Sequence, residues 1–146
     1  MIFGRDPNRT ATAEWYGIHR LLYRYIACVD AADAAGTADL FVPHGSLVSH
    51  VMGTTCFGRQ AIHDYIGSLR NSWRAIRIHL ALPDVSILDE QSAVSSAYFT
   101  VYGAGGADHW GLYTDRFLNA EGGWLFERRE ISLKGAAPDS QRMAHR

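Results

Sequence analysis

Apolar positions near the start of the chain follow a helical period. From Thr12 onward, large side chains recur every three or four residues and predict one buried stripe along a helix. The members of this stripe are Trp15, Ile18, Leu22, Tyr25 and Val29. The stretch RYIACVDAAD, residues 24–33, ends the helix with two acids, Asp30 and Asp33, on or near the packing face. A carboxylate beside a buried stripe is unusual, and the pattern alone does not say what either acid does.

The rest of the chain divides into two more helices and a series of strands. A short helix is predicted at about 37–41, ending before Pro43, and a third over RQAIHDYIGSLRNSW, residues 59–73. Alternation of apolar and polar residues, with glycine-containing turns, predicts the strands. These strands cover 46–51, 75–88 with a break or bend at Pro83, 91–103, 109–120 and 124–133.

Helices that precede a meander of long antiparallel strands are typical of an α+β fold, with the helices packed on one face of a curved sheet. Such a sheet can enclose a pocket between the two layers. We expect one domain over residues 1–146, with a core of about 12–134, a loose arm at 1–10 and a flexible tail at 135–146.

Strand alternation groups the candidate polar residues by face. In the strand 109–120, one face carries His109, Gly111, Tyr113, Asp115 and Phe117. Strict alternation in the last strand places Arg129 with Ile131, on the face opposite Phe126. Alternation likewise places His79 opposite Ile78. Alternation alone leaves open which of these faces meets the helices.

Composition excludes several classes of protein. Hydrophobic residues make up 47% of the chain, charged residues 20%, and the formal net charge is −1, without a basic patch for nucleic acid or a membrane surface. The start of the chain lacks a signal-peptide apolar run, and the two cysteines, Cys28 and Cys56, are far apart, so we expect a cytoplasmic protein. The seven histidines show no HExxH or HxH spacing, and GAGGAD connects strands. We therefore expect no metal and no cofactor.

Several short motifs, in order, resemble the SnoaL-like branch of the NTF2-like superfamily. They are the helix pattern I-x-x-L-x-x-x-Y-x-x-x-V-D ending at Asp30, an LF pair, G-R-x-A-I from Gly58, R-I-H at 77–79, G-x-Y-x-D at 111–115 and G-G-W-x-F-x-x-R ending at Arg129. The matched elements span about residues 13–134. The resemblance implies an NTF2-like cone that encloses a pocket.

The resemblance also implies site residues. In scytalone dehydratase, bile-acid dehydratase and hexachlorocyclohexane dehydrochlorinase, an Asp near the end of the first helix orients a His on the first long strand. The positions that match are Asp30 and His79, and the imidazole would act as a general base. Arg129 and Tyr25 match residues that would stabilise a leaving group or an enolate. The expected substrate contacts are Tyr113, Val29, Tyr98 and Ile131.

The expected function is therefore a cofactor-independent lyase, dehydratase-like, or an isomerase acting on a small, mostly apolar, cyclic molecule. A polyketide cyclase, an epoxide hydrolase and a non-catalytic binding module remain open, as does the small subunit of an oxygenase. Asp33 is expected to be structural but could replace Asp30. His109 is expected at a hairpin edge, and a second acid/base in the pocket is the alternative for it. A homo-oligomer, dimer or trimer, is expected because the curved sheet needs cover.

Overall fold

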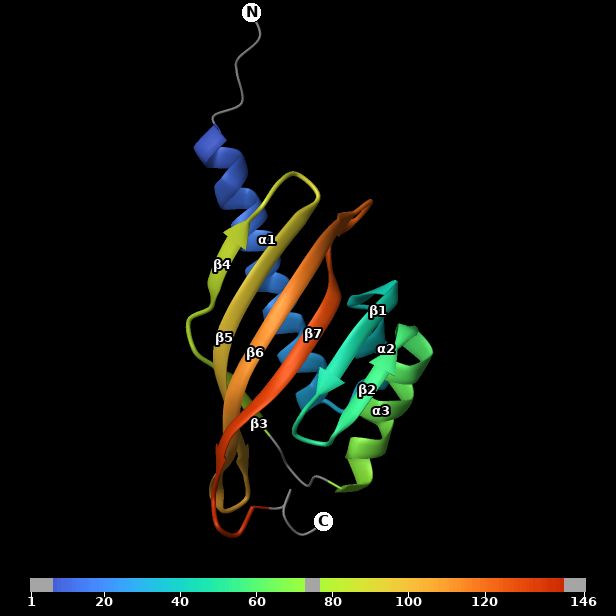
Figure 1. Ribbon diagram of the computed structural model, residues 1–146, viewed down its shortest axis with the longest axis vertical. Helices are drawn as coiled ribbons and strands as arrows, with labels where there is room; N and C mark the ends of the chain where they lie inside the picture. The colour runs from blue at the N-terminus through green and yellow to red at the C-terminus, as the bar shows by residue number, and fades with distance from the viewer. Residues whose placement is uncertain (1–6, 73–76, 141–146) are drawn as a thin grey trace, which may run out of the picture.

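A computed structural model describes residues 7–72 and 77–140 of the chain. Three helices lie on one side of a curved, seven-stranded sheet (Figure 1). Helix α1, the longest, runs diagonally behind the three long strands, and the two shorter helices lie beside the small strands at the other end of the sheet (Figure 1). The α+β class predicted from the order of the elements is confirmed.

The helices are α1 (Pro7–Asp30), α2 (Ala34–Ala38) and α3 (Gly58–Ser72). Helix α1 begins before the predicted Thr12, so residues 7–10 belong to a helix and not to a loose arm; residues 1–6 lie outside the described residues. The apolar stripe is buried at Ile18 and Tyr25, but Trp15 is 42% exposed. Asp33 is structural, as expected, because its carboxylate caps α2 by accepting the N–H of Gly36.

The seven strands form one mixed sheet in the order β2-β1-β7-β6-β5-β3, and β4 pairs with β5. Only β1 and β7 pair in parallel among the described strands; every other pair is antiparallel. The strands are β1 (Phe41–Ser49), β2 (Thr54–Phe57), β3 (Arg77–Leu80), β4 (Asp84–Ile87), β5 (Ser92–Gly103), β6 (Gly106–Ala120) and β7 (Gly123–Ala136). The predicted break at Pro83 separates β3 from β4. The sequence did not predict β2.

A bulge in β7 corrects the predicted faces of the last strand. Phe126 pairs with Phe117 of β6, but the next pair is Arg128 with Arg116, so Glu127 is an extra residue on β7. The extra residue shifts the alternation by one position. Phe126 and Arg129, predicted on opposite faces, are therefore both buried. In β6 the alternation holds, and residues 109, 111, 113, 115 and 117 are all buried.

The end of the chain is also more ordered than predicted. Strand β7 extends to Ala136, and the backbone N–H of Ala137 donates to the carbonyl oxygen of Asp108. Ser140 is only 3% exposed. The predicted flexible tail is thus wrong for residues 135–140, and residues 141–146 lie outside the described part of the chain.

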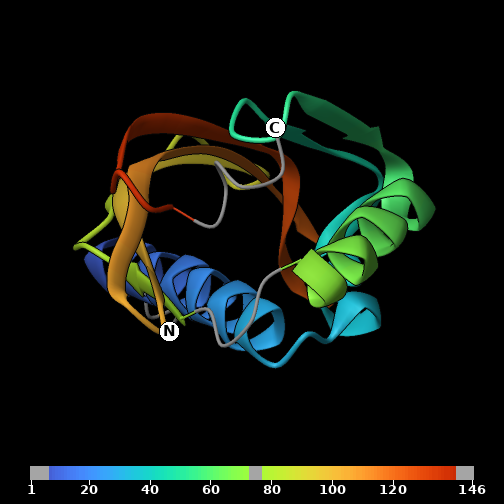
Figure 2. The same cartoon turned by 90° about the horizontal axis from the view of Figure 1, so that it is seen from below.

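The sheet curls around α1, so that its concave face and the helices enclose the core (Figure 2). Strand β1 extends the sheet from β7 toward α3, because it pairs with β7 and packs against α3. Within residues 7–72 and 77–140, no helix combines the length and apolar character needed to cross a membrane.

Candidate functional site

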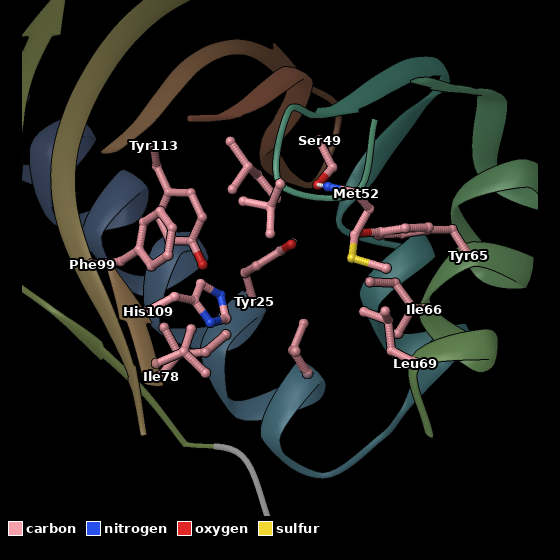
Figure 3. Close-up of a pocket in the computed structure, with 14 residues that line it drawn as sticks. Tyr25, Ser49, Met52, Tyr65, Ile66, Leu69, Ile78, Phe99, His109 and Tyr113 are labelled. Atoms are coloured by element: carbon pink, nitrogen blue, oxygen red, sulfur yellow. Dashed lines mark hydrogen bonds between the residues drawn. The ribbon is translucent and has the colours of Figure 1, made fainter. Parts of the chain in front are cut away.

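A pocket opens between the concave face of the sheet, α1 and α3 (Figure 3). Its empty volume is about 490 Å³, counting the space at its open mouth. Most of the lining is apolar, which is usual for sites that bind small molecules. The lining residues are Tyr25, Val29, Ser49, Val51, Met52, Tyr65, Ile66, Leu69, Ile78, Phe99, Val101, His109, Tyr113 and Ile131.

Two buried tyrosines supply polar groups at the inner end of the pocket. Tyr25 comes from α1 and Tyr113 from β6, and each is 2% exposed. Figure 3 shows their hydroxyl oxygens directed toward the hollow. Burial raises the pKa of both phenols, although the nearby Arg129 guanidinium partly opposes the shift. Both hydroxyls therefore stay protonated near neutral pH and can donate hydrogen bonds.

His109 lies in the sheet wall of the pocket, beside Phe99 and Ile78 (Figure 3). Its Nδ1 is 2.8 Å from the Oδ2 of Asp108, and both side chains are buried. Consecutive strand residues normally point to opposite faces. Here Val101 pairs with His109 and Tyr102 with Ala107, so Asp108 is an extra bulge residue, and its carboxylate can reach the imidazole next to it.

This contact favours one tautomer of the imidazole. A carboxylate at Nδ1 favours a proton on Nδ1, so in neutral His109 the Nε2 atom is the basic nitrogen. A carboxylate there also stabilises the imidazolium that forms when Nε2 takes a proton. The His109–Asp108 pair therefore has the geometry of a general base with its orienting acid.

Behind the two tyrosines lies a buried ion pair. Arg129 of β7 stands directly opposite Asp115 of β6 and donates to its two carboxylate oxygens, from Nε at 2.7 Å and from Nη2 at 2.8 Å. The side chains are 1% and 0% exposed. Ser95 of β5, the cross-strand neighbour of Asp115, also donates to the carboxylate at 3.5 Å. This is the bidentate geometry in which a buried pair is best compensated.

The Arg129 guanidinium supports the tyrosines from outside the hollow. Its central carbon lies 4.2 Å from the ring centre of Tyr25 and 3.8 Å from that of Tyr113. The third nitrogen, Nη1, is buried without a hydrogen-bond partner among the described residues. Arg129 does not line the pocket, contrary to the prediction of a residue at the substrate. Its bulge-shifted position places it under the aromatic rings.

The opposite wall carries a third phenol. Tyr65 of α3 lies across the pocket from His109, near Ser49 and Met52 (Figure 3). Burial raises the pKa of Tyr65 to about 12, partly offset by hydrogen bonding to Ser49. The pocket therefore has polar groups at two ends, with apolar side chains between them.

Neither member of the predicted Asp30–His79 dyad is among the residues that line the pocket. His79 is exposed on the outer side of β3, where its ring packs on Tyr102 with the ring centres 4.6 Å apart. Its neighbour Ile78 takes the inward position instead, because successive residues of β3 alternate. The carboxylate of Asp30 accepts the backbone N–H of Ile78 at 3.1 Å and so ties the end of α1 to β3.

Asp30 is half-buried rather than open to the hollow. Desolvation raises the pKa of its carboxyl, and the bond from Ile78 and the charges of Arg77 and His79 partly oppose that shift. The geometry therefore gives Asp30 a structural part that is already evident, while a catalytic role for it stays a prediction.

Of the other predicted site residues, most line the pocket and one does not. Tyr25, Val29, Tyr113 and Ile131 line the pocket, whereas Tyr98 is 65% exposed on the outer face of β5. Phe99 occupies the inward position beside it. His109 was expected at a hairpin edge and is instead 3% exposed in the pocket wall.

Sequence reasoning missed the roles of Asp108, Asp115 and Tyr65. For Asp115, the shared face with His109 and Tyr113 in β6 was a usable signal. For Asp108 there was no such signal, since nothing in GAGGAD announces a bulge.

The sequence profile of the SnoaL-like domain matches residues 9–130, so the chain belongs to the SnoaL-like family. This family of the NTF2-like fold includes dehydratases, cyclases and isomerases, and its fold usually binds small molecules. A comparison with curated proteins finds no match to this chain.

Solved structures with a similar fold include proteins with and without a named activity. A Mycobacterium tuberculosis protein of unknown function has a TM-score of 0.86 at 21% identity, over 97% of this chain and 89% of the other. A candidate scytalone dehydratase from Novosphingobium aromaticivorans has a TM-score of 0.80 at 20% identity, over 89% and 90%. An NTF2-like protein with a cystatin-like fold, also from Novosphingobium aromaticivorans, has a TM-score of 0.77 at 21% identity, over 94% and 96%. At these identities the likeness shows the fold alone.

Proposed function

We propose that the protein is a cofactor-independent lyase, dehydratase-like, or isomerase that removes a proton from carbon in a small, mostly apolar, cyclic molecule. The observation that carries the proposal is the buried His109–Asp108 pair in the wall of an apolar pocket. This assignment gives His109 the role that the sequence resemblance gave to His79. The lining is mostly apolar, with tyrosine hydroxyls at both ends, and this suits a small cyclic molecule that carries a carbonyl or hydroxyl group.

In this mechanism Nε2 of His109 takes a proton from a carbon next to a carbonyl group. The electron pair of the broken C–H bond forms an enolate, which the hydroxyl donors of Tyr25 and Tyr113 stabilise. In a dehydration, the enolate then expels a β-hydroxyl group, which leaves as water after it receives the proton from His109. In an isomerisation, His109 returns the proton to another carbon.

Arg129 acts in this proposal as a positioning residue. Its guanidinium lies against the faces of both tyrosines, so it holds their rings and favours negative charge on their hydroxyls. Asp115 fixes the guanidinium through two hydrogen bonds. The set therefore keeps two donors aimed at the point where the enolate oxygen develops.

The test is a comparison of two histidine variants on a panel of hydroxylated cyclic ketones, with loss of water followed by mass and ultraviolet absorbance. We expect His109→Gln to lower kcat/KM by at least about a hundredfold, the range typical of a lost general base. The matched control, His79→Gln, should keep activity because its ring lies outside the pocket. Circular dichroism and thermal melting check that both variants fold. Loss of activity in His79→Gln with full activity in His109→Gln would contradict the proposal.

A non-catalytic small-molecule-binding module is the second candidate. It is favoured by the outward position of His79, since the dyad inferred from the family's enzymes is not in the pocket. Under this alternative, ring compounds bind to the wild type and to His109→Gln alike, and neither protein changes them. Calorimetric titration together with product analysis separates the two candidates. Polyketide cyclisation remains a variant of the first, because it too begins with proton removal from carbon.

We also propose that the chain self-associates through the outer face of β5 and β6. Three large side chains are exposed there: Tyr98 is 65%, Tyr102 37% and Trp110 38% exposed. Exposed aromatic residues gathered on one face are typical of interfaces. We expect sedimentation equilibrium to give a mass above the 16.2 kDa of one chain, and Tyr98→Glu to lower it. The matched control is Tyr23→Glu, on the surface of α1 and 71% exposed; a wild-type monomer at all concentrations would contradict the proposal.

A further inference from the structure

A short segment at the end of the described chain, residues 137–140, is fastened to the bulge that carries the acid of the His109–Asp108 pair. The backbone N–H of Ala137 donates to the carbonyl oxygen of Asp108 at 2.8 Å. The hydroxyl of Ser140 donates to the Asp108 carboxylate at 2.6 Å. Ser140 closes a turn on itself, because its own N–H donates to the carbonyl of Ala137 at 3.0 Å. Main chain and side chain therefore hold the same residue.

The atom that Ser140 contacts is the one that matters for His109. Oδ2 of Asp108 accepts from Ser140 and also lies 2.8 Å from Nδ1 of His109. An aspartate side chain turns about two bonds, and a bulge residue has lost the regular pairing that would hold its backbone. A second donor on Oδ2 restricts that rotation and keeps this oxygen against the imidazole.

We propose that Ser140 is a positioning residue that acts on His109 through Asp108, so that a segment following the last strand aligns the proposed general base. The proposal rests on the function proposed above for His109. Ser140 is not among the residues that line the pocket, so the proposed effect passes through Asp108. Its effect is to hold Asp108 so that the neutral imidazole carries its proton on Nδ1 and presents Nε2 as the base.

The first experiment needs no substrate. The full chain is labelled with nitrogen-15 in its histidines, and the His109 signals are assigned by their loss in His109→Gln. We expect wild-type His109 to show a protonated Nδ1, with a proton signal protected from exchange. Ser140→Ala should broaden that proton signal and mix the two tautomers, whereas Ser140→Thr, which keeps a hydroxyl, should restore the wild-type spectrum. Asp139→Ala is the matched control, since this neighbouring side chain is exposed.

The second experiment uses a substrate found in the ketone panel. Ser140→Ala should lower kcat about tenfold, the scale expected for one hydrogen bond to a charged group, and leave KM within about twofold. Ser140→Thr and Asp139→Ala should stay near wild type. If Ser140→Ala does not fold, Ser140→Cys replaces it, because a thiol of similar size is only a weak donor.

The two experiments separate the two proposals. If the His109 spectrum of Ser140→Ala equals that of wild type, the positioning role is wrong, whatever the turnover. If the spectrum changes but no substrate depends on His109, the alignment by Ser140 stands and the proposed function fails. A fall in kcat with an unchanged spectrum also overturns the positioning role, since the effect would then not pass through Asp108.

Discussion

Arg129 and Asp115 place a positive and a negative charge in a core from which water is excluded. Neither side chain is more than 1% exposed. Burial of such a pair is costly, and the cost is offset here by two short hydrogen bonds and by the faces of Tyr25 and Tyr113. The pair is therefore most vulnerable to the loss of a single partner.

Replacing Asp115 with asparagine keeps the shape of the side chain and removes its charge. We expect Asp115→Asn to lower the free energy of unfolding by about 3–5 kcal/mol, because Arg129 then stays buried without a counter-ion. Urea unfolding followed by circular dichroism gives the measurement. The control is Arg116→Gln, which breaks the exposed Arg116–Glu127 pair and should cost less than about 1 kcal/mol. Equal stability of the two variants would show that the buried pair is dispensable.

At the scale of elements, two bulges decide which side chains meet. The bulge at Glu127 brings Phe126 and Arg129 to the same face of β7, and the bulge at Asp108 brings an acid beside His109. Each bulge adds one residue to one strand and so reverses the alternation beyond it. Sequence alternation cannot show such an insertion, because the pattern of side chains is read from one strand and the bulge depends on its partner.

Where a strand has no extra residue, alternation predicts the buried face correctly, and β6 beyond Asp108 is an example. From His109 to Phe117 β6 itself has no extra residue, because both register shifts against β7 insert the extra residue on β7, and the face predicted from alternation is the buried face. Helix α1 likewise placed Tyr25 and Val29 correctly from its period. The fold was predictable because these patterns repeat over many residues and tolerate an error at either end.

The site was predictable only in part. Tyr25, Val29, Tyr113 and Ile131 reach the pocket, as predicted, but His79 and Tyr98 do not. Strand β3 has only four residues, and a one-residue difference in register decides whether Ile78 or His79 points inward. The family motif correctly placed β3 next to the pocket. Which side chains of β3 point inward depends on its pairing with β5, and the motif does not contain that information.

At the scale of the whole molecule, the curled sheet gathers three phenols around one space. Tyr25 of α1, Tyr65 of α3 and Tyr113 of β6 come from three different elements and meet only because the sheet closes over the helices (Figure 3). Burial raises the pKa of each. The stability of the fold is therefore linked to keeping these hydroxyls protonated.

This linkage predicts a steep loss of stability in alkali. Below pH 10 the phenols are protonated in both the folded and the unfolded states, and their contribution is complete. Above pH 10 the unfolded chain releases the Tyr65 proton, while the folded chain keeps it until about pH 12. Each such tyrosine lowers the free energy of unfolding by about 1.4 kcal/mol per pH unit in this window.

The measurement is urea unfolding at pH 8, 10 and 11. Above pH 10 the free energy of unfolding of Tyr65→Phe should fall less steeply than that of wild type, by about 1.4 kcal/mol per pH unit, whatever the effect of the substitution at pH 8. Tyr23→Phe, a substitution on the exposed surface of α1, should leave the decline as in wild type. An identical slope in Tyr65→Phe and wild type would show that Tyr65 does not titrate differently in the two states.

The acid and the base of the proposed pair are joined by a single peptide bond. In a pair such as Asp30 and His79, the acid lies on α1 and the base on β3, two elements that are far apart in the sequence. The distance between them would change with every movement of α1 relative to β3. Asp108 and His109 instead carry a covalent tether, and their separation does not depend on the distance between the layers. Movements of α1 or α3 that widen the mouth for a ring-sized guest can therefore occur without separating proton donor from acceptor. The pocket can therefore open to a ligand without changing the position of Asp108 relative to His109.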